Sequence, residues 1–197
     1  MQRKGFGRYA WNTGDVYVGN WENGYTTGRG VKSIAASSIN RSACNSHHFD
    51  AYSTQTLNQG STSDVYTGQW ENDEAHGCGV KQYACGDAYY GDFEINKRHG
   101  HGIYIWSNGD FYEGEFVDGS CSGQGMKFMN SGDIYDGEFF ENKANGYGVK
   151  TFASGDVYMG HCHNDERHGY GLMSWANGDQ YEGYFEDGEQ SGFGQKR

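Results

Sequence analysis

The sequence predicts an all-β fold, an elongated and twisted single-layer antiparallel sheet built from tandem β-hairpins. Three observations predict it. A short motif recurs at a fixed spacing, the residues between its copies alternate between two faces, and polar or glycine-rich turns separate the alternating stretches. The 197 residues include 33 glycines and no proline, which is typical of a backbone that turns many times.

The recurring motif is Gly-Asp-x-Tyr-x-Gly. Its tyrosine returns every 23 residues, at Tyr66, Tyr89, Tyr112, Tyr135, Tyr158 and Tyr181. An earlier copy contains Tyr17, and one copy begins with Ser63 instead of glycine. Four positions after the tyrosine comes an aromatic residue, except where Cys162 takes its place: Trp21, Trp70, Phe93, Phe116, Phe139 and Phe185. A Gly-x-Gly then closes each unit, so the motif defines one structural repeat.

These copies define the predicted domain organisation. Residues 1–13 form an N-terminal half repeat with Gly5-Phe6-Gly7, and residues 14–197 form seven repeats of 23 residues. An inserted loop is expected at about 33–62, because this stretch is rich in Ser, Ala and Asn and contains no motif. We interpret it as a disordered insertion, with a partner-binding arm or a decayed repeat as the alternatives.

Each repeat contains two stretches that alternate between two faces. In Tyr112-Glu113-Gly114-Glu115-Phe116, the rings and the glycine share one face and the glutamates share the other. The second stretch is expected to place Gly100, Gly102, Tyr104 and Trp106 on one face. Paired glycines would leave room for a neighbouring ring to lie flat on the backbone, and stacked hairpins would bury their aromatic residues against one another.

Composition excludes several classes of function. The formal net charge of −11 argues against nucleic acid as a partner, since phosphate binding needs an excess of Lys and Arg. No apolar run is long enough to span a bilayer, and no signal peptide is expected before the patterned sequence. The five cysteines include no CxxC pair, which is typical of reduced thiols in a cytoplasmic protein. No nucleophile triad or P-loop is present, so neither an enzyme nor a cofactor is expected.

Four sets of polar residues are candidate sites. The repeated aspartates follow Gly or Ser and are interpreted as turn residues. His76, His99 and His168 precede Gly-x-Gly and are interpreted in the same way, with pH sensing as the alternative. His161-Cys162-His163 resembles a metal cluster but lacks a second ligand pair, so no metal is expected and Cys162 would fill the aromatic position. The lysine row is interpreted as stems that cover aromatic rings, with anion binding as the alternative: Lys32, Lys81, Lys127 and Lys150.

The pattern resembles the MORN (membrane occupation and recognition nexus) repeat. Tyr66-Thr67-Gly68-Gln69-Trp70 with His76-Gly77-Cys78-Gly79 matches the family motif well, and the resemblance covers about 14–34 and 63–197. It implies a grooved sheet that binds protein partners in cytoskeletal assemblies, including the radial spoke heads of the ciliary axoneme. The alternative that it implies is a peripheral membrane adaptor that recognises anionic phosphoinositides.

The expected partner-binding groove is lined by the aromatic rows: Tyr17, Trp21, Tyr66, Trp70, Tyr89, Phe93, Tyr112, Phe116, Tyr135, Phe139, Tyr158, Tyr181 and Phe185. The expected partners are structural proteins of a large assembly, including other MORN proteins or a second copy of the chain joined through its end strands. Those strands lie in residues 5–11 and 192–197. Membrane lipid is the less favoured partner, and the expected location is cytoplasmic and cytoskeleton-associated, in the axoneme of a cilium or flagellum.

Overall fold

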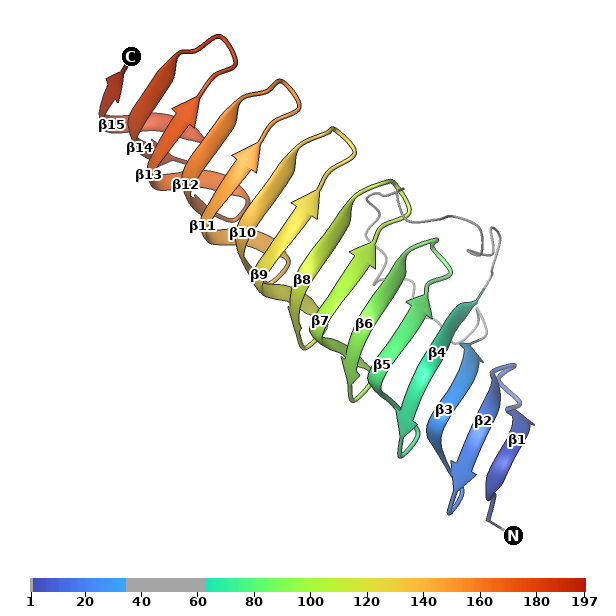
Figure 1. Cartoon of the computed structure of the whole chain (residues 1–197). Helices are drawn as coiled ribbons and strands as arrows, with labels where there is room; N and C mark the ends of the chain where they lie inside the picture. The colour runs from blue at the N-terminus through green and yellow to red at the C-terminus, as the bar shows by residue number, and fades with distance from the viewer. Residues whose placement is uncertain (1, 35–62) are drawn as a thin grey trace. The chain divides into compact units, whose positions relative to one another are not determined.

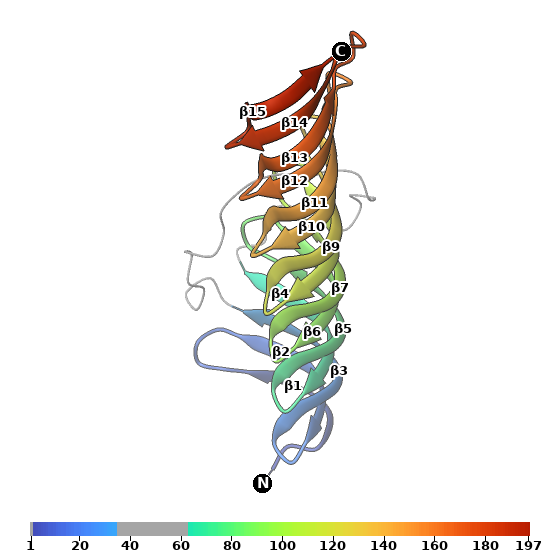
Figure 2. The same ribbon diagram turned by 90° about the vertical axis from the view of Figure 1, so that its left-hand side faces the viewer.

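The computed structural model describes residues 2–34 and 63–197 (Figure 1), and the insertion expected at about 33–62 lies almost entirely outside them. The chain divides into two compact units, Met1–Asp110 and Phe111–Arg197. The described residues contain strands and turns and no helix, so no helix among them could cross a membrane. In the two ribbon views the strands of each unit form a single twisted layer (Figures 1 and 2).

In the first unit, each strand pairs antiparallel with the next one in the chain. The strands are β1 (Gly5–Ala10), β2 (Val16–Glu22), β3 (Tyr25–Ile34), β4 (Asp64–Glu71), β5 (Glu74–Gln82), β6 (Ala88–Glu94) and β7 (Lys97–Ile105). The pairing of β3 with β4 joins the segments on either side of residues 35–62 in regular register, with Gly30 opposite Gly68. The strands on either side of residues 35–62 therefore continue the repeat pattern.

The second unit follows the same order without interruption. Its strands are β8 (Phe111–Val117), β9 (Ser120–Phe128), β10 (Ile134–Phe140), β11 (Lys143–Thr151), β12 (Val157–His163), β13 (Glu166–Ser174), β14 (Gln180–Glu186) and β15 (Glu189–Lys196). The prediction of an all-β fold made of consecutive antiparallel hairpins is confirmed in both units.

Two kinds of turn alternate along the chain. Inside a repeat, a two-residue turn such as Glu141-Asn142 has positive φ at both residues (50° and 71°), the geometry whose twist matches paired strands. Between repeats, a longer turn ends on a glycine such as Gly132 (φ 94°), whose N–H donates to the carbonyl of Met129 at 2.7 Å. The glycine of each Gly-Asp motif is therefore required by the turn that precedes its strand.

The two faces of the sheet have different roles. The side chain of Tyr112 lies on what we call the core face, together with Phe116, and both are buried. Glu113 lies on the opposite face, which we call the outer face, and is exposed. The alternation predicted for the first strand of a repeat is therefore confirmed.

The core of each repeat is a tyrosine ring lying on a pair of glycines. Gly114 and Gly125 are cross-strand partners, and a Cβ atom added to Gly125 would overlap the ring of Tyr112. The Tyr112 hydroxyl donates to the carbonyl of Glu115 at 2.9 Å. The Tyr112 ring makes edge-to-face contacts with Phe116 of its own repeat and with Phe139 of the next repeat. The ring centroids are 5.2 and 4.8 Å apart, respectively. The aromatic residue of the next repeat thus completes the core around Tyr112.

The second strand contains a β-bulge that the alternation did not predict. The pairing of β6 with β7 is regular up to Gly91 opposite Gly102, and then shifts so that Asp92 lies opposite His99. Gly100 has φ 61°, and a Cβ atom there would point at the Asp92 side chain on the outer face. The expectation that Gly100 shares a face with Gly102 is wrong. The positive φ of Gly100 at the bulge directs its Cβ position to the outer face, whereas that of Gly102 is directed to the core face.

Hydrogen bonds join neighbouring repeats at both ends of their strands. At one end, Oδ1 of Asp133 accepts the N–H of Ala153, in the next turn of the same kind, at 2.9 Å. At the other end, Oδ1 of Asn142 accepts the N–H of Cys121, in the preceding repeat, at 2.9 Å. The repeated aspartates do bind backbone N–H groups, as their interpretation as turn residues requires, but the bond reaches the next repeat instead of their own turn.

We expect Gly125→Ala to destabilise the protein strongly, because the added methyl group would overlap the Tyr112 ring. The free energy of unfolding in urea should fall by about 1–3 kcal/mol. The neighbouring exposed residue gives a matched control, Gln124→Ala, which should change it by less than about 0.5 kcal/mol. Equal stability of the two variants would show that the ring does not need the glycine pair.

Stability should also fall at alkaline pH. Burial raises the pKa of Tyr17 and of Tyr66 to about 12, and it raises the pKa of Tyr112 as well. Unfolded phenols ionise near pH 10, so the unfolded chain loses protons first and the free energy of unfolding should decline from about pH 10 to about pH 12. Urea unfolding at a series of pH values measures this decline, and a Tyr17→Phe/Tyr66→Phe variant should show a shallower one. A flat profile over this range would contradict the burial of these phenols.

Candidate functional site

The aromatic residues expected to line a groove are the core of the sheet. All thirteen have between 0 and 7% of their surface exposed. The phenol hydroxyls of the tyrosines donate to backbone carbonyls. Their rings alternate in edge-to-face contacts, such as Tyr66 with Phe93 at 4.8 Å. Partner binding by these aromatic residues stays a prediction. In the isolated chain they are buried, so the exposed surface consists of other residues.

Cys162 occupies the aromatic position of its repeat, as the sequence indicated. It is buried, and burial raises the pKa of its thiol. The space left by the missing ring is lined by Arg167, its cross-strand partner. The Arg167 guanidinium lies 5.5 Å from the centre of the Phe185 ring and donates to the carbonyl of Gly188. A cation and a small thiol therefore replace one aromatic residue of the core row.

The lysine row lies on the core face, opposite the buried tyrosines. The ammonium group of Lys32 is 5.2 Å from the Trp11 ring, and that of Lys150 is 5.1 Å from the Phe152 ring. Lys81 lies 3.7 Å from a carboxylate oxygen of Asp64. These contacts fit the interpretation that the lysine stems cover aromatic rings. Anion binding by Lys32, Lys81, Lys127 and Lys150 stays a prediction.

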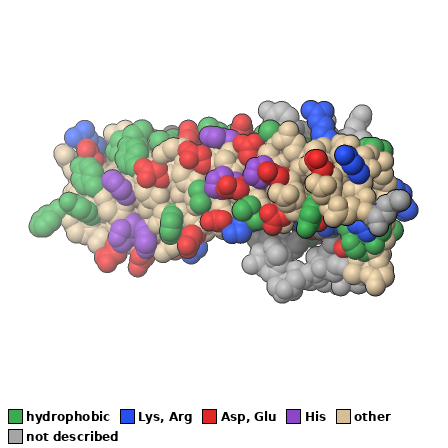
Figure 3. Space-filling model, turned by 90° about the horizontal axis from the view of Figure 1, so that it is seen from below, with side chains coloured by type: hydrophobic (Ala, Val, Ile, Leu, Met, Phe, Trp, Pro, Cys, Tyr) green, Lys and Arg blue, Asp and Glu red, His purple; other side chains and the backbone are tan. Residues whose placement is uncertain are grey.

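The histidines lie on the outer face near the two-residue turns. His76 is 3.7 Å from Glu71, and His99 is 3.4 Å from Glu94, with all four side chains largely exposed. Figure 3 shows histidine side chains (purple) next to acidic side chains (red) on one face. Exposed pairs of this kind contribute little to stability.

His161 and His163 share a strand face but turn to different neighbours. The ring of His161 meets Tyr147 at 5.6 Å, whereas Nδ1 of His163 is 3.0 Å from Oδ1 of Asn145. In residues 2–34 and 63–197, no three His, Cys, Asp or Glu side chains are grouped so that they could hold a metal ion.

The outer face of the first unit carries an apolar depression. Its volume is about 610 Å³, and its walls are the outer side chains of β1 to β5 together with the glycine backbone between them. Phe6, Val18, Val31, Thr67 and Val80 supply most of the apolar wall, and Arg29 lies at its edge. A concave apolar surface of this size can accept side chains of a partner.

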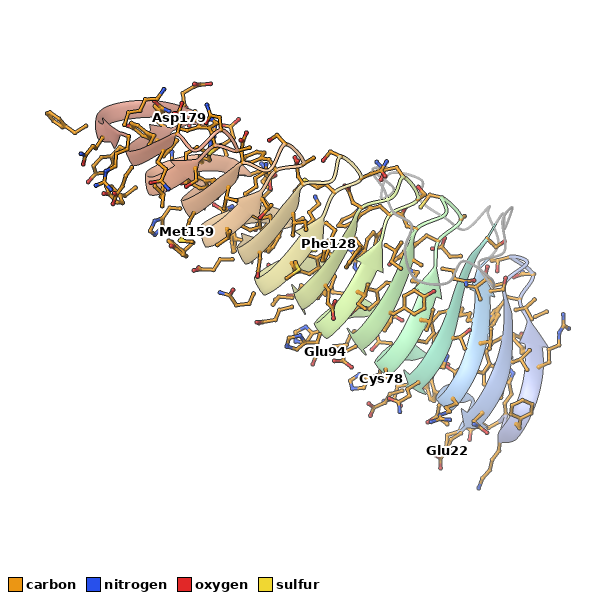
Figure 4. All side chains as sticks on the ribbon, turned by 45° about the horizontal axis from the view of Figure 1, so that its top comes forward. Glu22, Cys78, Glu94, Phe128, Met159 and Asp179 are labelled. Atoms are coloured by element: carbon orange, nitrogen blue, oxygen red, sulfur yellow. The ribbon has the colours of Figure 1, made fainter. Side chains whose placement is uncertain are left out.

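The outer face of the second unit carries exposed aromatic side chains. Tyr147, Tyr170, Tyr184 and Phe193 have 46, 50, 53 and 93% of their surfaces exposed. Met159, on β12, projects from the same face and is also exposed (Figure 4). Monomeric proteins seldom expose a contiguous row of large apolar residues, so this surface is the strongest candidate for partner contact.

The sequence contained a signal for these residues that the groove prediction did not use. Tyr147, Tyr170 and Phe193 are the central residues of three Gly-x-Gly sequences. The second glycine of each sequence faces the core tyrosine, so the residue before it must face outward. The prediction chose the residues that recur in every repeat, and recurrence here marks the core.

The comparison with protein families agrees with this repeat architecture. The MORN repeat family model matches residues 2–16, 17–35, 66–87, 89–111, 112–134, 135–157, 158–180 and 181–197. No curated protein matches the chain. Among solved structures, the TCP domain of SAS-4 (dCPAP) from Drosophila melanogaster, in complex with a proline-rich motif of Ana2 (dSTIL), is 9% identical with a TM-score of 0.35. That match covers 98% of this chain and 88% of the other. The family model spans most of the sequence, and the chain therefore belongs to the MORN repeat family.

Proposed function

We propose that this chain is a non-enzymatic protein-binding scaffold in a ciliary or other cytoskeletal assembly, similar to the MORN proteins of radial spoke heads. MORN repeats indicate a protein that binds other proteins or associates with a membrane. The observation that supports protein binding is the exposed outer face. The core tyrosines, glycines and phenylalanines pack on the other face, so exposed residues such as Tyr170 and Tyr184 lie outside the buried core.

The repeated polar groups support a scaffold because the fold accounts for them. Asp64, Asp133 and Asp156 each accept the backbone N–H of a residue twenty positions later. Glu115 and Glu138 accept the N–H groups of the β-bulges. These copies share one structural role, to which Asp64 adds burial and an ion pair with Lys81 at 3.7 Å.

A location in the cilium or flagellum axoneme is part of the proposal. A chain consisting mostly of repeats offers two long sheet faces, and its acidic charge suits protein partners better than nucleic acid. Fusion of the chain to a biotin ligase in ciliated cells should enrich structural proteins of the axoneme or basal body over those labelled by the free ligase. Enrichment of membrane lipid enzymes without structural proteins would contradict the scaffold.

The alternative function, an adaptor for anionic phosphoinositides, depends on the lysine row. We expect the purified chain to float no better with phosphoinositide-containing liposomes than with neutral ones at low salt, because the lysines contact rings and carboxylates of the chain. A Lys32→Gln/Lys150→Gln variant provides the control. Specific flotation that this variant loses would favour the membrane adaptor over the scaffold.

A further inference from the structure

The last repeats differ from the earlier ones at two outer-face positions. These positions are the third residue after the motif tyrosine and the central residue of Gly-x-Gly. From β11 onward they hold what we call the outer aromatic row: Tyr147, His161, Tyr170, Tyr184 and Phe193. Before β11 the rings at these positions are isolated ones, Phe6 in the half repeat and His101, and the other residues are Asn20, Arg29, Gln69, Cys78, Asp92, Glu115, Gln124 and Glu138.

Two members of the row, His161 and Tyr184, replace side chains that support the fold. Oε1 of Glu138 accepts the bulge N–H of Tyr147 at 3.3 Å, and Glu115 does the same for Gln124 at 3.2 Å. In the last two repeats His161 and Tyr184 hold this position, and within the described residues neither makes a side-chain bond to the bulge amide. His161 and Tyr184 therefore lack the side-chain hydrogen bond to the bulge amide that the earlier repeats have. This loss indicates that the two residues have a role other than stability.

The rings of the row are arranged in pairs with open faces. Tyr147 lies opposite His161, with centroids 5.6 Å apart, and Tyr170 lies opposite Tyr184, with centroids 5.5 Å apart. Both pairs meet edge to face, at 79° and 80°. In an edge-to-face pair, one ring points its edge at its neighbour, so the π-face of that ring is not covered by the neighbour. A flat cation can stack on this open π-face.

The charges around the row favour a cationic partner. Asp136, Glu138 and Glu182 lie on the same outer face and are exposed. Oε1 of Glu182 accepts the Tyr170 hydroxyl at 3.0 Å, so one carboxylate adjoins the ring directly. Lys127, Lys150, Arg167 and Lys196 project from the core face instead, whereas Lys143, opposite Phe140, lies on the outer face beside a turn and donates to Oδ1 of Asn164. The outer face thus combines open aromatic rings with carboxylates.

We infer that the outer aromatic row binds an extended, arginine-containing segment of a partner protein. This inference rests on the proposed scaffold function and names the chemistry of its partner. A guanidinium group can stack on a tyrosine ring and donate to a carboxylate at the same time, which an ammonium group does less well. The two ring pairs are two strands apart, about 10 Å. A segment in the extended polyproline II conformation rises about 3.1 Å per residue with three residues per turn, so side chains three residues apart lie on one side at about 9 Å. Arginines at every third position match the row.

A fluorescein-labelled peptide of four Arg-Gly-Ser triplets tests the inference by anisotropy with the full chain. We expect binding that weakens as NaCl rises from about 50 mM to about 500 mM. The Lys-Gly-Ser peptide should bind at least about threefold more weakly, because lysine lacks the stacking plane. A Gln-Gly-Ser peptide should show no binding. Equal binding of all three peptides, or none of the arginine peptide, would overturn the inference.

Two matched variants locate the site. Tyr147→Ser/Tyr170→Ser/Tyr184→Ser should weaken binding of the arginine peptide about tenfold or more. Phe6→Ser/Tyr25→Ser/Tyr90→Ser removes the same number of exposed rings from the first unit and should keep the affinity within about twofold. Asp136→Asn/Glu138→Gln/Glu182→Gln should weaken binding while keeping the hydrogen-bond acceptors of Glu138 and Glu182.

Thermal melting of every variant confirms that it is folded before its binding is interpreted. Equal loss in the two triple aromatic variants would reject the row as the site. If the arginine peptide fails to bind while the ligase fusion still labels axonemal proteins, the scaffold stands and only the partner chemistry assigned to this face is wrong.

Discussion

The contact of each motif tyrosine with its glycine pair is the constraint on which the rest of the structure depends. A single-layer sheet has no second layer to bury its side chains, so each ring must lie down on its own backbone. This is possible only where both paired residues lack a Cβ atom, as at Gly114 and Gly125. The flattened ring leaves one edge to its own Phe116 and another to Phe139 of the next repeat. Cooperativity between repeats follows from that shared contact.

Because every repeat satisfies the same constraint, recurrence identifies structural residues. The motif tyrosine, the glycine pair, the turn glycine and the Asp and Asn side chains that bind neighbouring repeats recur for this reason. Information about a partner must then lie where equivalent positions differ. The change from polar residues to Tyr147, Tyr170 and Phe193 is such a difference, and so is Cys162 with Arg167 in the core. The former faces outward and can be recognised, whereas the latter is enclosed.

Sequence reasoning predicted the hairpins, their order and the ring-on-glycine contact, because alternation and a fixed period express these features directly. It missed the β-bulge, since the positive φ of Gly100 reverses a Cβ direction that alternation assigns to the other face. It also placed binding on rings that the fold buries. Alternation shows which residues share a face, and the paired glycines indicate a ring that lies flat, but neither shows how much of that ring a partner could still reach. In the structure, none of the surface of Tyr112 is exposed.

An uncovered outer face creates a risk that the charge of the chain offsets. Exposed rings such as Tyr184 and Phe193 would favour association between copies of the protein. Carboxylates on the same face, including Asp136, Glu138 and Glu182, carry a like charge on every copy and so oppose face-to-face contact. A cationic segment removes that repulsion and covers the rings in the same step. The charge that keeps identical faces apart therefore also selects the partner, which explains how aromatic exposure and acidic composition occur together in one repeat array.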